Sequence, residues 1–389
     1  MNKATIRVKD LGDVVTGNTP STDNPEYYGD SYLFIKATDI DENSKYTLNT
    51  EDMYSKKAFT KYRDSLIPKD STCVVTIGSV GKKITMSHEN LFVNQAINAV
   101  IPSTKFDNEY VYYLMKENLP QLKILNSGTA SGRENISKTS FEKMKLIVDC
   151  DINNQIKAGK ILSTIDKVIL NNKEIIKSIE DILRKYYDKT FVYDSNDREQ
   201  IYVKLNSLVN RRDVKLKEWD DLKLVDLSRM PRFSISLLNI GDAIELQTNI
   251  KEVKEYDLIF GSIRPYLGKA GFSPINGAIA GSVFNFTPKD NNMYSYLLFL
   301  ISSKDFIKFA DNYSNGTKMP VVDYDDLMRY RIKLLINRNI YKEFNDFCMP
   351  FIKEIKNKIE ENIKLSELRD SLSNRIFTFK LNLENAKIE

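Results

Sequence analysis

A heptad-spaced apolar series within residues 155–191 constrains the fold of this chain more than any other feature. Its positions alternate in steps of three and four residues: Leu162, Ile165, Ile169, Asn172, Ile176, Ile179, Leu183, Tyr186 and Thr190. This spacing keeps one apolar stripe facing a partner helix, so it predicts one strand of a coiled coil. At about 1.5 Å per residue, the stripe is roughly 42 Å long.

A second long helical pattern at residues 339–379 offers a partner helix within the same chain. Its apolar positions are Ile352, Ile355, Ile359 and Asn362, followed after a shift in phase by Leu365, Leu368, Leu372, Ile376 and Phe379. Each series contains one asparagine, and a polar residue in an apolar seam selects the register of the pair at some cost in stability. The alternative interpretation is that Asn172 and Asn362 are simply half-buried.

Length and composition indicate a globular protein of two or three domains. The chain has 389 residues, of which 42% are hydrophobic and 28% are charged, and a single core rarely grows to that size. No apolar run approaches the roughly 20 residues that a bilayer requires, and the first residues lack the apolar centre of a signal peptide. We therefore expect a cytoplasmic protein.

Several kinds of catalytic chemistry lack their residues. Three scattered cysteines and one histidine predict neither a disulfide framework nor a zinc site. Segment 78–82 has too few residues between its glycines for a phosphate-binding loop, and His88 has no nucleophile elbow to serve. Residues 24–27 resemble the Asn-Pro-Pro-Tyr motif of amino-methyltransferases, but the second proline and a glycine-rich turn for the methyl donor are missing. We therefore expect a binding protein with no catalytic residues of its own.

The net charge of +4 permits binding to a polyanion without requiring it.

The chain contains an internal repeat. The matching segments lie about half a chain apart: 70–82 with 257–269, 108–114 with 292–298, 128–129 with 316–317, and 190–191 with 378–379. In the first pair, the second copy is interpreted as carrying four extra residues between its Gly-Ser and Gly-Lys positions. Two copies of a globular domain followed by a long helix explain this pattern most simply.

We therefore predict an α+β protein with two tandem mixed α/β domains, separated by two long helices that form an antiparallel coiled coil with pseudo-twofold symmetry. Short β-branched runs bounded by turn residues supply the strands of each domain. The predicted boundaries are a first domain at 1–150, a central helix at 151–193, a linker at 194–217, a second domain at 218–337, a C-terminal helix at 338–380 and a tail at 381–389.

Five short segments carry a resemblance to a known family. They are 11–29, which contains Gly17-Asn18-Thr19-Pro20-Ser21-Thr22, and 77–82, 94–96, 155–156 and 264–269. With the duplication and the two coiled-coil helices, they resemble the specificity subunits (HsdS) of type I restriction-modification systems across nearly the whole chain.

The resemblance implies a protein without catalysis of its own. In this family, two target-recognition domains each read one half of a split DNA sequence, and the long helices set the gap between the halves. Methyltransferase subunits of the HsdM type dock to form an adenine-N6 methylating complex, which restriction subunits of the HsdR type can join. S-adenosylmethionine, and ATP with Mg²⁺ where restriction occurs, would belong to those partners, with no cofactor bound directly by this chain. The roughly 42 Å stripe is comparable with the 34–36 Å turn of B-DNA, so the helices are expected to act as a ruler.

Polar loop residues of each domain are the candidates for contacting DNA. Arginine and lysine suit phosphate or guanine, whereas asparagine and glutamine suit adenine. The candidates are Lys82, Lys83, Arg133, Arg264, Lys269, Asn94, Gln95 and Asn135, with Thr76, Ser79, Arg232, Ser262, Tyr266 and Lys318 as weaker ones. The alternative interpretation is that these side chains only complete turns.

Two other functions fit the same pattern. One is a coiled-coil scaffold whose globular domains bind protein partners, which would need no exposed basic loops. The other is a DNA-acting enzyme with a divergent active site. Sequence-selective DNA binding, measured with and without a methyltransferase subunit, separates these alternatives.

Overall fold

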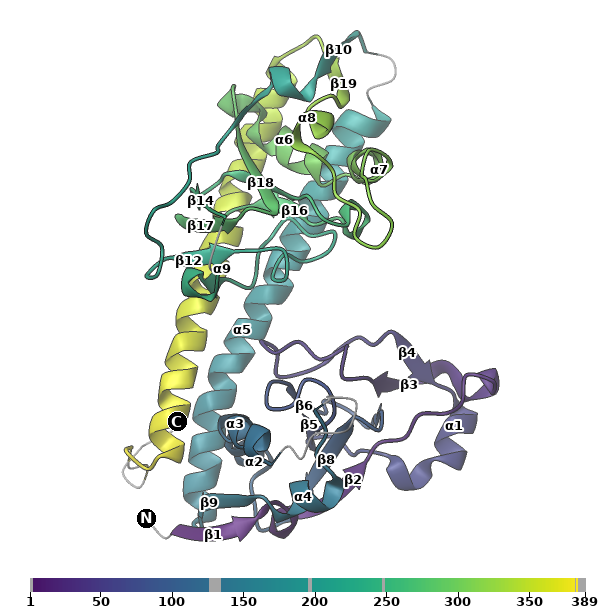
Figure 1. Ribbon diagram of the computed structural model, residues 1–389, viewed down its shortest axis with the longest axis vertical. Coiled ribbons are helices and arrows are strands. Elements are labelled where there is room, and N and C mark those ends of the chain that lie inside the picture. Colours follow the sequence, from purple (N-terminus) through teal and green to yellow (C-terminus); the bar gives the residue numbers. More distant parts are fainter. Residues whose placement is uncertain (1–2, 126–133, 195–197, 247–248, 382, 384–389) are drawn as a thin grey trace. The chain divides into compact units, whose positions relative to one another are not determined.

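The computed structural model describes residues 3–125, 134–194, 198–246, 249–381 and 383. The chain divides into two compact units, one formed by residues 1–168 with 365–389 and the other by residues 169–364 (Figure 1). Each unit therefore contains one globular domain and a part of each of the two long helices.

The globular domain of the first unit contains two small sheets and a separate strand pair. The four-stranded antiparallel sheet has the order β2 (Gly12–Thr16), β8 (Ile97–Pro102), β5 (Thr72–Val75) and β6 (Ile84–Met86). The second sheet has the order β4 (Asp52–Tyr54), β3 (Tyr28–Ile35) and β7 (Phe92–Val93), with β3 parallel to β7. The separate pair consists of β1 (Lys3–Arg7) and β9 (Lys145–Asp149). The short helices are α1 (Lys56–Lys61), α2 (Asn108–Glu117), α3 (Leu119–Ile124) and α4 (Lys138–Lys143).

The globular domain of the second unit repeats this topology, with one additional strand at the edge of its second sheet. Its antiparallel sheet has the order β11 (Val209–Arg211), β18 (Val283–Pro288), β15 (Leu258–Gly261) and β16 (Ala270–Phe272). Its second sheet has the order β13 (Gly241–Asp242), β12 (Lys223–Val225), β17 (Gly277–Ala280) and β14 (Ile250–Val253), with β12 parallel to β17. The separate pair consists of β10 (Gln200–Lys204) and β19 (Arg331–Leu335). The short helices are α6 (Tyr294–Ile301), α7 (Lys304–Asn312) and α8 (Tyr324–Leu327).

From β5 to the last strand of the domain, the two copies are related by a constant shift of 186 positions. The isolated bridge between Ile77 and Asn135 recurs between Ile263 and Val321, and β5 and β15 begin 186 positions apart. The expected four-residue insertion is therefore wrong. The Gly-Ser and Gly-Lys dipeptides of the second domain do not lie 186 positions after those of the first. The hydrogen-bonded register of the strands therefore shows which residues of the two domains are equivalent, and the dipeptides do not. Likewise α6 begins 186 positions after α2, so the expected match of 108–114 with 292–298 was two residues out of register.

The segment expected to be a linker, 194–217, belongs to the second domain. It contains β10, which pairs with β19, and β11, which pairs with β18. These strands correspond to β1 and β2 of the first domain. The linker was expected because the helical seam stops there, but the next domain begins within the segment with two short strands.

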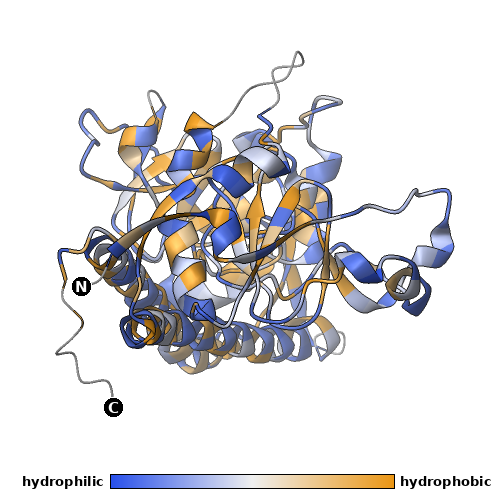
Figure 2. Cartoon of the chain, turned by 90° about the horizontal axis from the view of Figure 1, so that it is seen from below, coloured by the Kyte–Doolittle hydropathy of each residue, from blue (hydrophilic) through white to orange (hydrophobic). Residues whose placement is uncertain are grey.

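The two predicted long helices are confirmed as α5 (Ile152–Tyr187) and α9 (Asn339–Phe377). Figure 2 shows hydrophobic and hydrophilic stretches alternating along them, as expected for helices with one buried face. In the second unit they run antiparallel, because Asn172 contacts Asn362 whereas Tyr186, further along α5, contacts Phe347, earlier in α9. The predicted seam residues that are fully buried are Leu162, Ile169, Asn172, Ile176, Leu183, Ile352, Ile355 and Ile359, and those that are half-buried are Ile165, Ile179, Tyr186, Leu365 and Leu372.

The two asparagines that the sequence places in the two seams contact each other. The amide Nδ2 of Asn172 donates to Oδ1 of Asn362 at 2.9 Å, and Nδ2 of Asn362 donates to the carbonyl oxygen of Ile169 at 3.4 Å. Both side chains are buried. The interpretation that they are merely half-buried is therefore wrong.

The expected phase shift in the second seam is also wrong. In the first unit Leu368 is 50% exposed, whereas Arg369 is buried. Nη1 of Arg369 lies 2.6 Å from Oδ1 of Asp166, and the hydroxyl of Tyr113 donates to the other carboxylate oxygen. The seam of α9 therefore keeps its heptad spacing through Arg369, because a buried guanidinium is tolerated when it is paired with a hydrogen-bonded carboxylate.

Candidate nucleic-acid interface

Two of the predicted residues of the first domain present exposed polar side chains. Lys82 is exposed in the turn between β5 and β6. Gln95 is exposed between β7 and β8, and its Oε1 accepts a hydrogen bond from the hydroxyl of Thr19. Asn94 is half-buried, and its Oδ1 accepts from the backbone N–H of Ala96 at 3.2 Å. Gln95 and Lys82 are thus the side chains of this group that the domain offers to a ligand.

Two further candidates of the first domain are half-buried, and a third lies outside the described residues. Ser79 is half-buried in the same turn as Lys82. Asn135 is half-buried and bridges to Ile77 through its backbone. Arg133 lies outside the described residues.

Thr76 and Ser262 occupy equivalent positions and are both buried. The hydroxyl of Thr76 accepts from Nδ2 of Asn98 at 2.8 Å. The hydroxyl of Ser262 donates to the carbonyl oxygen of Ser282 at 2.8 Å. Their polar atoms stabilise the domain interior and are not presented at the surface.

Lys83 and Lys269 are a second equivalent pair, and each ammonium group is bound to a backbone carbonyl oxygen of its own domain. Nζ of Lys83 donates to the carbonyl oxygen of Ala37 at 3.0 Å, and Nζ of Lys269 donates to that of Leu227. Ala37 and Leu227 each lie two residues after the end of a corresponding strand, β3 or β12. Burial lowers the pKa of Lys269, and the nearby charge of Arg232 acts in the same direction. In the free protein, each of these lysines ties the two sheets of its domain together.

In the second domain, three loops meet through backbone hydrogen bonds. The N–H of Phe233 donates to the carbonyl oxygen of Gly268 at 2.9 Å, and the N–H of Arg264 donates to that of Pro320 at 2.7 Å. Nη2 of Arg264 also donates to the carbonyl oxygen of Lys318 at 3.3 Å. These contacts join segments 231–235, 262–270 and 314–322, which we call the three-loop surface.

The three-loop surface combines positive charge with exposed apolar side chains. Its exposed cations are Arg232, Arg264 and Lys318, all of them sequence candidates. Its exposed apolar or aromatic side chains are Phe233, Tyr266 and Met319. The three segments contain no aspartate or glutamate. Such a surface suits a polyanion that also has apolar or aromatic parts, as nucleic acid has.

Phe233 and Met319 were not among the sequence candidates. Neither side chain has a polar or charged group, which all the predicted contact residues have. The signal in the sequence was the run Pro231-Arg232-Phe233, in which an aromatic residue follows a cation in a turn-rich segment.

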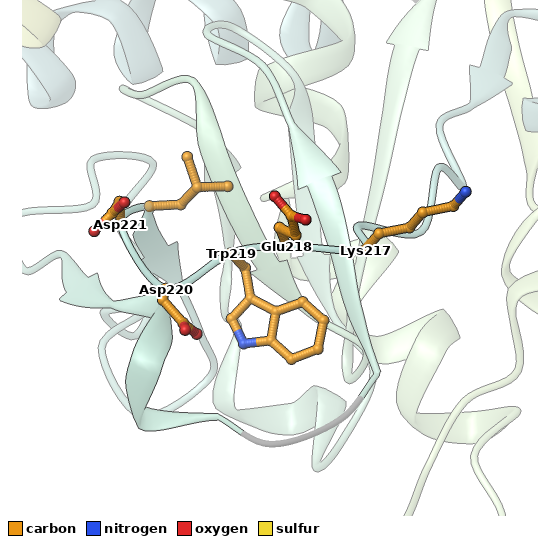
Figure 3. A pocket seen from close by; sticks show the side chains of 6 residues that line it. Lys217, Glu218, Trp219, Asp220 and Asp221 are labelled. Carbon is orange, nitrogen blue, oxygen red and sulfur yellow. The ribbon is translucent and has the colours of Figure 1, made fainter.

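A different hollow of about 590 Å³ in the second domain has the opposite charge. It is lined by Lys217, Glu218, Trp219, Asp220, Asp221 and Leu222. Figure 3 shows the side chains of Glu218 and Trp219 leaving the backbone in opposite directions, with Asp220 beside the indole. Nε1 of Trp219 donates to the carbonyl oxygen of Leu246 at 3.2 Å, so the indole is held as part of the fold. Three carboxylates against one ammonium group make this hollow unsuited to a phosphate backbone.

Within the described residues, no group of three or more His, Cys, Asp or Glu side chains is arranged to hold a metal ion. In that same part of the chain, no helix combines the length and the apolarity needed to cross a membrane.

Comparison with known proteins points to one family. Residues 2–181 match the family model described as "Type I restriction modification DNA specificity domain". The HindI specificity subunit of Haemophilus influenzae, a type I restriction enzyme subunit, is 31% identical over 180 residues, which cover 45% of this chain and 39% of that protein. The MjaIX specificity subunit of Methanocaldococcus jannaschii is 21% identical over 413 residues, which cover 97% of this chain and 93% of that protein.

A solved structure has the same fold. It is the crystal structure of the type I restriction-modification system S subunit from M. genitalium, which matches with a TM-score of 0.58 at 15% identity. The match covers 97% of this chain and 96% of that one. The predicted fold class, two tandem α+β domains with long helices, is confirmed by this similarity together with the strand order of each domain.

Proposed function

Because the chain belongs to the family of type I restriction-modification specificity subunits, we propose that it selects the DNA target of such a complex. Each globular domain reads one half of a bipartite sequence. The chain acts by binding, and methyl transfer is carried out by adenine-N6 methyltransferase subunits of the HsdM type that dock to it. Where restriction subunits of the HsdR type join, they supply cleavage.

The observation that carries this proposal is the combination of a repeated frame with different loops. The strands that the two domains share have the same order, and the second domain adds β14 at one sheet edge, yet the loops on equivalent strands differ in charge and size. Position 78 is glycine where position 264 is arginine, and segment 41–45 has two carboxylates where segment 231–235 has none. A DNA target with two unlike halves requires two domains that share a fold but differ in the residues that contact DNA.

The methyl donor and ATP are assigned to the partners. The described residues contain no group of three or more His, Cys, Asp or Glu side chains arranged to hold a metal ion, and the glycine-rich lysine turn at 78–83 lacks the spacing of a phosphate-binding loop. Lys83 in that turn is bound to Ala37. These features support a role in which the chain positions DNA and partner subunits supply the chemistry.

Selection from a random double-stranded DNA library, with the purified full chain, tests the proposal. The expected result is enrichment of two short sequences separated by a fixed number of unspecified base pairs. Enrichment of one contiguous sequence, or of none, would contradict it. Repeating the selection with a co-expressed methyltransferase subunit is expected to tighten binding without changing the letters.

The role of the helices as a ruler is tested separately. Inserting one heptad into both α5 and α9 lengthens the pair by roughly 10 Å, or about three base-pair steps. The expected result is a longer spacer between unchanged half-sites. An unchanged spacer would reject the ruler while leaving the two readers intact.

A further inference from the structure

Phe233 is an aromatic residue held in an unfavourable backbone conformation at the protein surface. Its φ angle is 54°, in the left-handed region that bulky residues rarely adopt. Its side chain is nevertheless 57% exposed. A strained conformation that leaves more than half of the side chain in solvent gains little from packing, and such outliers concentrate where a residue acts on a ligand.

The loop around Phe233 is built to hold the ring in this position. The backbone N–H of Phe233 is bound to the carbonyl oxygen of Gly268, and a Cβ atom at Gly268 would lie 2.7 Å from the ring. Gly268 itself has a φ of 62°. The next residue, Ser234, donates through its hydroxyl to Oε1 of Glu180 on α5 at 2.9 Å. Both ends of the turn are therefore fixed, which limits the freedom of the ring before any ligand arrives.

The surroundings of the ring identify the kind of ligand. Phe233 belongs to the three-loop surface, with Arg232, Arg264 and Lys318 as exposed cations and no carboxylate in the three segments. Tyr266 and Met319 add exposed apolar surface at 47% and 54%. Cations around an exposed aromatic ring match a chain of phosphates that carries bases with flat apolar faces and thymine methyl groups.

The first domain has no counterpart of this ring. Strand β12 ends 190 positions after β3, so the residue of the first domain equivalent to Phe233 is Asn43. The preceding residues of the first domain are Asp41 and Glu42, where the second has Pro231 and Arg232. The feature is therefore specific to one of the two domains.

We propose that Phe233 is a specificity-determining residue of the second domain, whose ring contacts the bases of the half-site that this domain reads. The inference rests on the proposed function and goes beyond it, because it assigns base contact to an apolar side chain and to one half-site only. Arg232, Arg264 and Lys318 hold the phosphates or base edges around it. The strain at residue 233 then serves to present the ring before DNA binds.

Substitution by glycine separates this role from a structural one. Phe233→Gly removes the ring and also relieves the left-handed backbone, because glycine adopts positive φ readily. The full-length variant is expected to unfold at the same temperature as the wild type or higher. Its affinity for the wild-type target is expected to fall about tenfold or more, as for loss of a base–aromatic contact. The dependence of affinity on salt concentration should stay the same, since no charge is lost.

Two control variants match the two properties of Phe233 in the same domain. Asn249→Gly relieves a left-handed residue, with a φ of 61°, outside the three-loop surface. Ile244→Ala removes an apolar side chain that is 65% exposed and lies between Asp242 and Glu245. Both are expected to keep wild-type affinity.

Selection from a random double-stranded DNA library gives the decisive readout. With Phe233→Gly, one or two positions in one half-site should lose their base preference while the other half-site is unchanged. A wild-type chain that enriches no sequence overturns the proposed function and this inference together. A wild-type chain that enriches a target, with Phe233→Gly enriching the same letters at the same affinity, overturns the inference alone.

Two further outcomes are informative. If Phe233→Gly keeps its DNA selection but no longer co-purifies with the methyltransferase subunit, the ring binds protein and the inference is overturned. If the glycine variant does not fold, Phe233→Leu carries the test, because it keeps an apolar side chain over Gly268 without an aromatic face. A loss of affinity below twofold for Phe233→Leu would then overturn the inference.

Discussion

Arg264 of the second domain occupies the place that Gly78 occupies in the first domain, 186 positions earlier in the chain. Both residues have positive φ angles, 51° and 93°. Their backbone N–H groups donate to the carbonyl oxygens of Pro320 and Glu134 at 2.7 and 3.0 Å. The same turn thus carries a guanidinium group in one domain and no side chain in the other, so the contact residues can change without a change in the frame.

Replacing Arg264 tests its role in DNA binding without disturbing its turn. Arg264→Gly suits the positive φ, so the thermal unfolding midpoint should not fall. DNA affinity should fall by about 1–3 kcal/mol, and the slope of log affinity against log salt should decrease by about one if the guanidinium contacts phosphate. Arg264→Lys keeps the charge but loses the bidentate geometry, so a normal slope with relaxed base preference indicates a base contact. Unchanged affinity for both variants would remove Arg264 from the interface.

Lys82 and Lys83 are adjacent but are expected to behave oppositely. Lys83 donates to the carbonyl oxygen of Ala37, so Lys83→Met should reduce the free energy of unfolding by about 1–3 kcal/mol with little change in the salt slope. Lys82 is exposed, so Lys82→Met should leave stability within about 0.5 kcal/mol and reduce the salt slope by about 0.9. Denaturant titration and binding at several salt concentrations measure both. A reversed pattern would show that Lys83 releases Ala37 and turns to phosphate when DNA binds.

The asparagine pair in the helix seam is expected to fix the register of the two helices and to lower the stability of the protein relative to an apolar pair. Asn362→Leu removes one of the two acceptors of Nδ2 of Asn172, while Oε2 of Glu361 at 3.0 Å remains, so it should cost about 0.5–1.5 kcal/mol. The double variant Asn172→Leu, Asn362→Leu should regain this loss or exceed the wild type, because a leucine pair suits an apolar seam. Thermal unfolding of the three variants measures the effect. A double variant no more stable than Asn362→Leu would contradict the role of the pair.

Sequence pattern predicted the long helices and the two-domain fold of this protein better than the residues that its surface offers to a ligand. The seam of α5 and the presence of one asparagine in each seam followed from heptad spacing, because a helix repeats its environment at fixed intervals. The hydrogen bond between Asn172 and Asn362 was not predicted. Arg369 was missed in the seam of α9, since its burial depends on Asp166, which lies far away in the sequence. The expected phase shift placed Leu368 in the seam, whereas in the structure it is 50% exposed.

The candidate site was predicted only as a set of loops. Lys269 was expected at the interface because it is basic, but its ammonium group is bound to Leu227, a partner that only the folded chain brings close. Phe233 was not predicted, since neither its left-handed conformation nor its exposure is encoded in the local pattern. Which polar groups remain available to a ligand depends on long-range hydrogen bonds that local pattern does not encode.

Glu180 links the loop of Phe233 to α5 and should make stability depend on pH. Burial raises the pKa of Glu180 above its ordinary value, despite hydrogen bonds from neighbouring serines that oppose the shift. The folded state therefore binds the proton more tightly than the unfolded state, so stability falls as pH rises from the unfolded pKa through the folded pKa. Glu180→Gln keeps an acceptor for Ser234 and cannot ionise. The stability of the variant relative to the wild type should therefore be greater at neutral pH than at acid pH.

Thermal unfolding between about pH 4 and pH 8 measures this difference. The exposed neighbour Asp181, changed to asparagine, is the control for removing one carboxylate from α5. A Glu180→Gln profile parallel to that of the wild type would show that Glu180 is solvated or paired in solution.

The central claim is that each domain reads its own half of one DNA target. The most direct measurement is the sequencing of methylated adenines in cells that express the methyltransferase partner with one of two variant chains. One variant combines Lys82→Gln with Gln95→Ala in the first domain, and the other combines Phe233→Gly, Arg264→Gly and Lys318→Gln in the second. The account predicts that each variant relaxes or abolishes base preference in one half of the methylated sequence and that the two affected halves differ. Identical changes from both variants, or a target unaltered by either, would contradict it.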